Sequence, residues 1–179
     1  MKLQIIAQIF GLGAMASLFM SYQQTERRKL IVGKLSADLF WTAHYLCLGA
    51  YGGMIPNFVG IFRELVFINR ERKKWANFML WPIVFILLNW GLGIRSFKAP
   101  INILPIAAST FVTVSLWIRK PRLTKIISIP VSVVFLIYDL FVGSYVGVVN
   151  ESKVICINSL REVISRQGLY IRLHSAHAG

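Results

Sequence analysis

The sequence predicts an all-α integral membrane protein with about seven transmembrane helices. Hydrophobic residues make up 56% of the 179 residues and the mean hydropathy is +0.61, which is too apolar for a soluble domain with a charged surface. The charged residues gather in short groups between long apolar stretches. One phrase recurs, because residues 45–53 read YLCLGAYGG and residues 139–147 read DLFVGSYVG. These observations predict helices in lipid and an internal repeat.

The apolar stretches predict the individual helices. A helix needs about 20 apolar residues to cross the hydrocarbon core. On that basis the candidate spans cover residues 3–22, 30–50, 54–69, 75–94, 101–118, 123–142 and 144–165. The first stretch lacks the small-residue cleavage site of a signal peptide, so we interpret it as a span. The third is the shortest, and five spans with re-entrant third and seventh elements is the alternative.

The basic residues predict the orientation. They occupy alternate connections, namely Arg27, Arg28 and Lys29, then Arg70, Arg72, Lys73 and Lys74, then Arg119, Lys120, Arg122 and Lys125. Because cytoplasmic loops are enriched in Lys and Arg, we expect the N-terminus outside and the C-terminus in the cytoplasm. The formal charge of +13 therefore reflects topology, and the lipid bilayer, not nucleic acid, is the expected partner.

The recurring phrase predicts how the spans are organised. Spans 1–3 and 5–7 align with an offset of about 94 residues, and span 4 has no counterpart. Three spans plus a linker span give the two copies the same orientation, so the repeats are expected to be parallel. Gly49 and Gly143 fall in the two turns. The predicted divisions are a first three-helix bundle at 1–70, a linker helix at 71–100, a second bundle at 101–167 and a cytoplasmic tail at 168–179.

Several residues carry a resemblance to known families. They are Ala7-Gln8, Glu26-Arg27-Arg28, His44, Leu48-Gly49, Tyr51, Arg63, Leu104-Pro105, Gly143-Ser144, Glu151 and Asn158. In order and spacing they resemble the YgjV family of bacterial inner membrane proteins over residues 5–165. The 3+1+3 arrangement of helices resembles the SWEET sugar transporters and PQ-loop proteins. The resemblance implies a multi-pass protein of the bacterial inner membrane and, more distantly, alternating access to small metabolites.

The prolines depart from the SWEET-like pattern. SWEET-type bundles carry prolines in the opening helix pairs of both copies, whereas here only the second copy has them, at Pro105 and Pro130. The first copy has Gly11 and Gly13 in span 1 and Pro56 in span 3. We therefore expect Pro105 and Pro130, with the turn glycines, to be the hinge positions, but not four symmetric proline hinges.

Polar residues inside apolar spans are the candidate binding residues, because such groups usually face the bundle interior. The set is Asn57, His44, Glu151, Asn158, Trp41 and Asp139. Asn57 and Glu64 share one face of span 3, Glu151 and Asn158 share one face of span 7, and the 94-residue offset superposes these faces. Two interpretations fit, namely a solute pathway on the pseudo-two-fold axis, or hydrogen bonds that only hold helices together.

Three further expectations concern single side chains. His44 can change charge near neutral pH, so it either senses protons or binds a ligand, or it is a neutral residue tied to another helix. Asp139 is expected near the outer end of span 6, partly hydrated and able to pair with Lys153. Glu64 and Glu162 are expected to pair with Arg63 and Arg161 at the cytoplasmic ends.

These features predict a small-solute carrier, of sugars or other metabolites. The alternative is a non-transporting receptor, chaperone or accessory subunit. We do not expect an enzyme, because the sequence has no Ser-His-Asp arrangement, phosphate-binding glycine loop or paired carboxylates with a catalytic geometry. Cofactors and metals are not expected, since there is no CxxC or histidine cluster. The solute, any ion coupling and the oligomeric state are left open.

Overall fold

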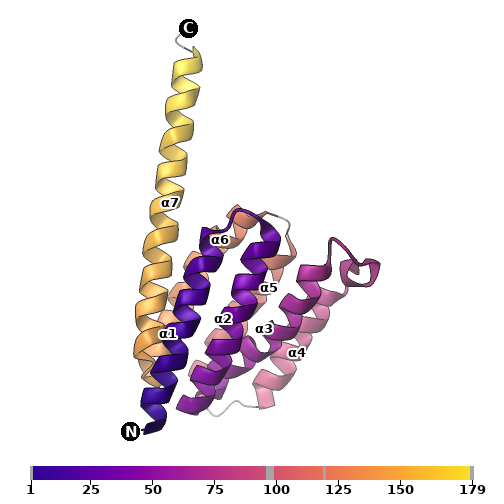
Figure 1. Ribbon diagram of the computed structural model, residues 1–179, viewed down its shortest axis with the longest axis vertical. Coiled ribbons are helices and arrows are strands. Elements are labelled where there is room, and N and C mark those ends of the chain that lie inside the picture. Colours follow the sequence, from indigo (N-terminus) through magenta and orange to yellow (C-terminus); the bar gives the residue numbers. More distant parts are fainter. Residues whose placement is uncertain (1, 96–98, 119, 178–179) are drawn as a thin grey trace.

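The computed structural model describes residues 2–95, 99–118 and 120–177, and all regular structure within them is helical. The α-helices are α1 (Lys2–Gln23), α2 (Arg27–Leu48), α3 (Tyr51–Asn69), α4 (Trp81–Arg95), α5 (Ile103–Trp117), α6 (Pro121–Val142) and α7 (Tyr145–His177). Short 3-10 helices η1 (Lys74–Asn77) and η2 (Pro100–Asn102) precede α4 and α5. The helices lie side by side, and α7 rises beyond the others towards the C-terminus (Figure 1). The predicted all-α class is confirmed.

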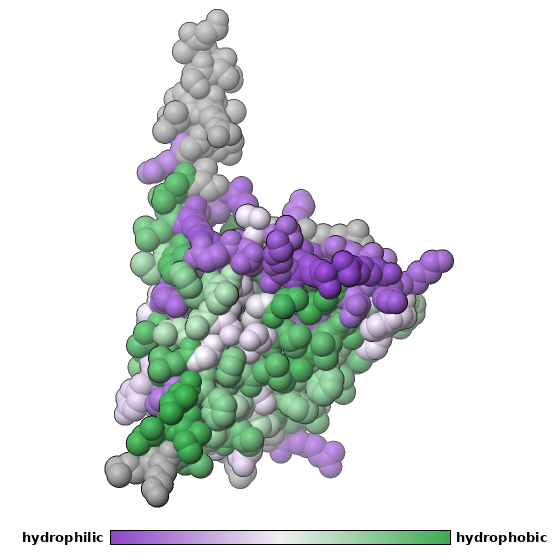
Figure 2. Space-filling model, viewed as in Figure 1, coloured by the Kyte–Doolittle hydropathy of each residue, from purple (hydrophilic) through white to green (hydrophobic). Residues whose placement is uncertain are grey.

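The outer surface is apolar and the interior contains many polar groups. Side chains such as Ile9, Phe111 and Phe141 are more than half exposed, and Figure 2 shows a broad hydrophobic surface below a hydrophilic band. Within the described residues, three helices are long and apolar enough to cross a membrane, at Leu3–Gln23, Pro100–Trp117 and Pro121–Val142. An apolar surface of this extent requires an apolar surrounding, which lipid provides.

Helices α2 and α6 end in the same way. Gly49 and Gly143 follow them with φ of 68° and 70°, the left-handed conformation that glycine adopts without strain. The next N–H in each copy donates to the carbonyl five residues earlier, from Ala50 to Tyr45 at 2.9 Å and from Ser144 to Asp139 at 3.0 Å. The recurring phrase is therefore a recurring turn, with the reversed chain starting α3 and α7.

Helices adjacent in the chain pack together in two groups, α1–α2–α3 and α5–α6–α7. Between the groups, α3 contacts α5, α1 contacts α7, and α2 approaches α6. Helix α4 packs against α3 and α5. The interior therefore lies between the two groups, and α4 lies to one side of it (Figure 1).

The basic connections lie at the end of the bundle where α1, α3 and α5 finish, and we call it the basic end (Figure 2). There, arginines bind the carbonyls that helix ends leave free. Arg161 Nη1 donates to the Tyr22 carbonyl at 2.7 Å, and Arg27 Nη2 donates to the Leu116 carbonyl at 3.0 Å. Tyr22 and Leu116 are 94 residues apart, so equivalent helix ends accept these bonds, although the two arginines are not at equivalent positions.

Two predicted segments have different bounds in the structure. The fourth was expected to begin at residue 75, but η1 and a turn precede α4, which begins at Trp81. Pro82 favours this start, because proline lacks an N–H and its fixed φ suits the first turn of a helix. The seventh was expected to end at residue 165, with a tail at 168–179. Instead α7 continues to His177, and residues 178–179 lie outside the described residues.

Candidate functional site

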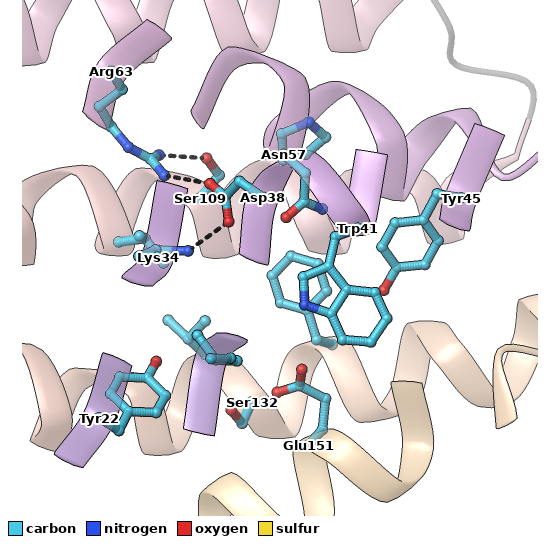
Figure 3. Close-up of a pocket in the computed structure, with 15 residues that line it drawn as sticks. Tyr22, Lys34, Asp38, Trp41, Tyr45, Asn57, Arg63, Ser109, Ser132 and Glu151 are labelled. Atoms are coloured by element: carbon cyan, nitrogen blue, oxygen red, sulfur yellow. Dashed lines mark hydrogen bonds and ion pairs between the residues drawn. The ribbon is translucent and has the colours of Figure 1, made fainter. Parts of the chain in front are cut away.

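A cavity of about 60 Å³ lies in the interior between the two helix groups (Figure 3). Residues from α1, α2, α3, α5, α6 and α7 line it. They are Leu18, Tyr22, Lys34, Asp38, Trp41, Tyr45, Pro56, Asn57, Arg63, Ser109, Val112, Val131, Ser132, Phe135 and Glu151. A space of this size with polar walls is large enough for water molecules.

The lining follows the internal repeat. Four pairs of lining residues are 94 positions apart in the sequence, namely Leu18 and Val112, Asp38 and Ser132, Trp41 and Phe135, and Asn57 and Glu151. Each pair takes one residue from α1–α3 and one from α5–α7. Equivalent positions of the two helix groups therefore meet around one space.

One wall of the cavity carries a buried group of four charges, which we call the charge quartet (Lys34, Asp38, Arg63 and Glu64). Lys34 Nζ lies 2.9 Å from Asp38 Oδ1, one helical turn away on α2. Arg63 Nη2 on α3 lies 3.0 Å from Glu64 Oε1 and 3.5 Å from Asp38 Oδ2. Lys34 also lies 3.8 Å from Glu64. The quartet thus joins α2 to α3 with two positive and two negative groups.

Neutral groups complete the surroundings of Arg63, whose side chain is 2% exposed. Its Nη1 donates to Ser109 Oγ at 3.2 Å and to Thr113 Oγ1 at 3.0 Å, both on α5. Gly60 leaves room for the quartet, since a Cβ there would lie 2.1 Å from Asp38 Oδ2. A buried charge is tolerated only when it is paired and hydrogen-bonded in this way.

The opposite wall carries a carboxyl group among neutral neighbours. Glu151 and Ser132 lie across the cavity from the quartet (Figure 3). Glu151 Oε1 accepts a hydrogen bond from Asn150 Nδ2 at 2.7 Å. Asn57 donates to the Gly53 carbonyl of its own helix at 2.7 Å. The indole ring of Trp41 borders the same space and stacks on Tyr45, with ring centroids 5.7 Å apart.

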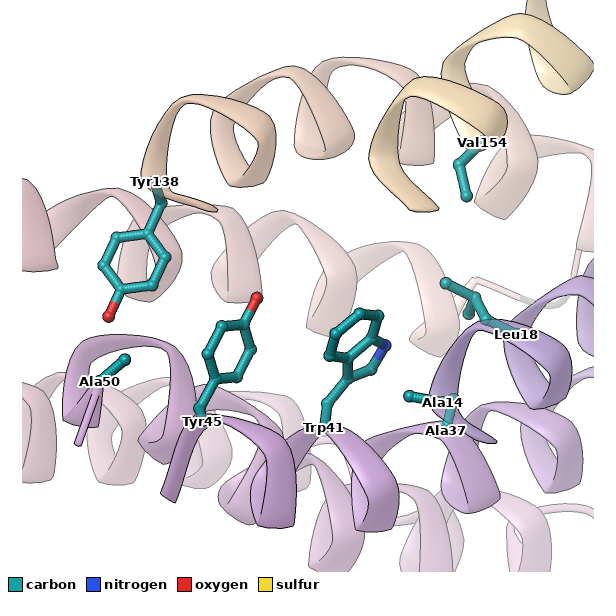
Figure 4. Packing of buried hydrophobic residues seen from close by; sticks show 8 residues of the cluster. All are labelled: Ala14, Leu18, Ala37, Trp41, Tyr45, Ala50, Tyr138 and Val154. Atoms are coloured by element: carbon teal, nitrogen blue, oxygen red, sulfur yellow. The ribbon is translucent and has the colours of Figure 1, made fainter. Parts of the chain in front are cut away.

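A layer of hydrogen bonds joins the two groups near the glycine turns. We call it the turn-end layer (His44, Tyr45, Tyr138, Asp139 and Ser144). Tyr45 Oη donates to Asp139 Oδ1 at 2.7 Å, and Tyr138 Oη accepts the Gly53 N–H at 2.8 Å. Figure 4 shows Tyr45 and Tyr138 side by side, next to Trp41. Both of these hydrogen bonds connect one helix group to the other.

His44 is fully buried in this layer. Its Nδ1 lies 2.7 Å from the Ala7 carbonyl oxygen and its Nε2 lies 2.8 Å from Ser144 Oγ. A carbonyl can only accept, so Nδ1 carries a hydrogen, and Nε2 can accept from the serine hydroxyl. A neutral imidazole satisfies both contacts.

Comparison with known sequences identifies the protein family of this chain. The model of a family described as Imp-YgjV, bacterial inner membrane protein, matches residues 5–165. The chain belongs to this YgjV family. It is 24% identical over 117 residues to the inner membrane protein YgjV of Escherichia coli (strain K12), an alignment that covers 65% of this chain and 61% of that protein. No solved structure matches. The apolar surface of this YgjV-family chain is therefore in contact with the lipid of a bacterial inner membrane.

The structure separates the predicted site residues of the YgjV-family chain into three places. Trp41, Asn57 and Glu151 line the cavity together. His44 and Asp139 lie in the turn-end layer. Asn158 lies elsewhere, because its Nδ2 donates to Ser128 Oγ at 2.8 Å, and it borders a second cavity near the basic end with Arg122, Lys125 and Arg161. Among the described residues, no group of three His, Cys, Asp or Glu side chains is placed to hold a metal ion.

The expectation for Asp139 was wrong. Its side chain is fully buried instead of partly hydrated, and its partner is Tyr45 instead of Lys153. Lys153 Nζ lies over the Phe19 ring, 4.7 Å from the centroid. The reason is the partner helix, because α2 covers the end of α6 and supplies a hydroxyl that the local sequence of the turn does not contain.

The expectation for the two glutamates was wrong in different ways. Glu162 is near the basic end, but it pairs with Arg122 of α6 at 3.0 Å, not with Arg161. Glu64 does pair with Arg63, yet both are buried beside the cavity. The side chains of adjacent residues on a helix point about 100° apart. Which ion pair each glutamate forms therefore depends on the side chains of the neighbouring helices.

Sequence reasoning missed Lys34 and Arg63 as residues of the site. Two signals in the sequence could have found them. Lys34 and Asp38 have the i, i+4 spacing of a helical ion pair inside an apolar segment. Arg63 lies six residues before Asn69, where α3 ends, which at 1.5 Å per residue is about 9 Å inside the helix. That depth requires partners in the interior.

Proposed function

We propose that this YgjV-family protein is a small-solute carrier or facilitator. In this proposal α1–α3 and α5–α7 are two bundles, α4 links them, and alternating access arises when one bundle rocks against the other. The observation that carries the proposal is the cavity, which is lined by equivalent positions of the two repeats. Carriers with parallel repeats hold solute at such an interface, near the middle of the membrane.

The contacts between helices support a pseudo-two-fold axis through the cavity. Exchanging α1 with α5, α2 with α6 and α3 with α7 turns the α1–α7 contact into the α5–α3 contact and leaves α2–α6 unchanged. Tyr45 and Asp139, which bond directly, are themselves 94 residues apart. The Tyr22 and Leu116 carbonyls, which both accept from arginines, are also 94 residues apart, although their donors come from α7 and α2, which are not exchanged with each other.

The proposal includes seven crossings with the N-terminus outside and the C-terminus in the cytoplasm. The basic end supports this orientation, since Lys and Arg accumulate on the cytoplasmic side. Helices α2 and α3 are less apolar than a free-standing span, but their charged quartet is paired inside the bundle. In this orientation the turn-end layer closes the cavity towards the outside.

The small size of the cavity indicates that this structure is a closed state of the proposed carrier. Sites for small molecules usually enclose about 300–1,000 Å³, whereas this one has about 60 Å³. A solute larger than a few water molecules therefore requires the bundles to separate. The hydrogen bonds of the turn-end layer and the quartet's bonds to α5 are the contacts that separation would break.

The same size favours a second candidate, a membrane receptor, chaperone or accessory subunit that transports nothing. In that case the polar side chains of the interior only hold helices together, as the bond from Asn158 to Ser128 does. Neither candidate requires catalytic chemistry at the cavity.

A thermal-shift screen of the purified full-length protein against sugars, nucleosides, vitamins and organic acids tests the proposal. A ligand at 100 times its Kd stabilises the folded state by about 2.7 kcal/mol. We expect one class to stabilise the wild type and Asn158→Ala, which leaves the cavity lining intact, but not Asn57→Ala. If no ligand acts while the variants lose stability on their own, the non-transporting module is the better description.

Cysteine labelling tests the orientation. In a background without Cys47 and Cys156, we expect Tyr145→Cys to react with a membrane-impermeant thiol reagent in spheroplasts. Glu71→Cys should react only after the membrane is opened. The opposite pattern would invert the proposed topology. Labelling of both sites before permeabilisation would mean that the chain does not cross the membrane an odd number of times between them, as α4, α5 and α6 do in the proposal.

A further inference from the structure

The interior of the protein contains more acidic than basic groups. Away from the basic end, the described residues place four carboxyl groups and two basic side chains inside the bundle, namely Asp38, Glu64, Asp139 and Glu151 with Lys34 and Arg63. The quartet accounts for both basic groups and two of the acids. A charge without a counter-ion at this depth is strongly unfavourable, so the other two carboxyls need another source of positive charge.

Glu151 has no ion-pair partner within the described part of the chain. The basic group that acts on it is Lys34, across the cavity, but Lys34 Nζ is already held by Asp38 at 2.9 Å. Lys153 is two residues along α7, where side chains diverge, and lies over Phe19. Ionisable groups face Glu151 from four helices, namely Tyr22 from α1, Lys34, Asp38 and Tyr45 from α2, Arg63 and Glu64 from α3, and Asp139 from α6. The cavity wall from α5 contributes only neutral groups.

Asp139 is the second unpaired carboxyl, but it is closed off. Its side chain is fully buried and does not line the cavity. Tyr45 separates it from that space by donating to Oδ1. His44 is bound to Ser144 and to a backbone carbonyl instead of to a carboxylate. Of the two carboxyls, Glu151 is the one that water in the cavity can reach.

The partner of Glu151 suits both a charged and a neutral carboxyl. Asn150 Nδ2 donates to Glu151 Oε1 at 2.7 Å, which stabilises the carboxylate. Asn150 Oδ1 is buried and has no hydrogen-bond partner. Rotation of the amide would present this oxygen to a protonated carboxyl, which donates where the carboxylate accepts. The equivalent position in the first repeat is Asn57, a neutral amide one methylene shorter, so a neutral side chain lines the cavity at that position of the other repeat.

We propose that Glu151 is an exchangeable proton site in the cavity, and that its proton is coupled to solute movement. The proton passes between cavity water and the Glu151 carboxyl as the site opens to either side of the membrane, and no covalent bond other than O–H forms or breaks. The coupling rests on the proposed carrier function, whereas the proton site does not. A metal ion in this role would need several oxygen ligands. The hydrogen-bonded neighbours of Glu151 are the Asn150 amide and the Ser132 hydroxyl, and no group of three acidic, His or Cys side chains within the described residues could complete such a site.

Infrared spectroscopy of the full-length protein in lipid bilayers tests the proton site without any solute. A protonated carboxyl in an apolar site has a C=O stretch separate from the carboxylate bands. We expect a part of this band to disappear as the pH is raised in the wild type and in Glu26→Gln, which removes an exposed carboxyl, and this titrating part to be absent in Glu151→Gln. Asp139, which cavity water does not reach, should contribute a band that does not titrate. Carbon-13 labelling of glutamate should shift the titrating band of the wild type. This measurement assigns the band to a glutamate without the use of a variant.

Two results would overturn the site. One is a titrating band that is unchanged in Glu151→Gln, and the other is a wild-type band that does not respond to glutamate labelling. Glu151→Asp keeps a carboxyl on the same helix and is expected to keep a titrating band at a shifted midpoint. If Glu151→Gln does not fold, the labelled wild type and Glu151→Asp still decide the question.

Coupling is tested in proteoliposomes with the solute class found by thermal shift. We expect an imposed pH gradient to drive solute accumulation by the wild type, while Glu151→Gln exchanges solute without accumulating it. Wild-type uptake that ignores the gradient would overturn the coupling. A solute that binds without a titrating Glu151 band would leave the carrier standing and remove the proton site. A titrating Glu151 band, with no solute in the panel that binds, would leave the proton site standing and remove the carrier.

Discussion

The two repeats share turns and helix contacts but differ in the charges at equivalent positions. In α1–α3 the quartet places charged groups at positions 34, 38 and 64, whereas 94 residues later α6 and α7 have Ser128, Ser132 and Asn158. Conversely, Asn57 and Tyr45 correspond to Glu151 and Asp139. Each repeat is therefore charged where the other is neutral.

This difference gives a symmetric backbone an asymmetric interior. The turns and helix ends repeat because they are made by backbone groups that every sequence has. The cavity, in contrast, has a wall of balanced charge from α1–α3 and a lone carboxyl from α5–α7. In the proposed carrier, a solute bound there would meet two chemically distinct sides.

The largest expected effect is at the quartet. Arg63→Met leaves Lys34 as the one cation for both Asp38 and Glu64, and breaking a buried ion pair in this way costs about 3–5 kcal/mol. The matched control is Ile157→Met, which introduces the same side chain at the equivalent position of α7 without removing a charge and should cost less than about 1.5 kcal/mol. Unfolding in detergent, followed by circular dichroism, measures both. Equal effects would mean that the charges do not distinguish the repeats.

Gly60 sharpens the same comparison through packing. An alanine Cβ at this position would lie 2.1 Å from Asp38 Oδ2, so Gly60→Ala should destabilise the protein by about 1–3 kcal/mol. The equivalent residue, Val154, already carries a side chain because no quartet faces it. Gly91→Ala is the control, since a Cβ there meets nothing within 4 Å. A Gly60→Ala variant as stable as Gly91→Ala would contradict the observed geometry.

The glycine turns should respond alike. Gly49 and Gly143 have φ of 68° and 70°, and a Cβ at either would meet open space. Each alanine substitution should therefore cost only the backbone strain, about 1–2 kcal/mol. Thermal unfolding of the two single variants and the double variant measures the costs, which should be equal and additive. A clear inequality would break the equivalence of the turns.

The smallest expected effect is at Asn158. Asn158→Ala removes the bond to Ser128 that joins α7 to α6, for a loss of about 1 kcal/mol or less. Asn69→Ala is the control, because Asn69 is only partly buried and its side chain makes an exposed hydrogen bond to Leu65 of its own helix. Chemical unfolding of both in the same detergent compares them. A loss of several kcal/mol at Asn158 would show that the second repeat depends on polar contacts as strongly as the first.

Local sequence was sufficient for the helices and turns. The apolar stretches placed α1, α2, α3, α5 and α6 to within a few residues, because length and composition act along the chain. The recurring glycines marked the ends of α2 and α6, because a left-handed residue favours glycine whatever surrounds it. The start of α4 and the end of α7 were misplaced, since tryptophans and alternating polar residues fit a helix, a 3-10 turn or a tail equally well.

Long-range packing decided the site. Trp41, Asn57 and Glu151 could be selected from the sequence as polar or aromatic residues within spans, but their meeting at one cavity depends on how six helices associate. The partners of Asp139 and Glu162 lie on helices 40 or more residues away. Ion pairs and hydrogen bonds act over a few ångströms in space, and that distance is set by packing between helices, not by spacing along the chain.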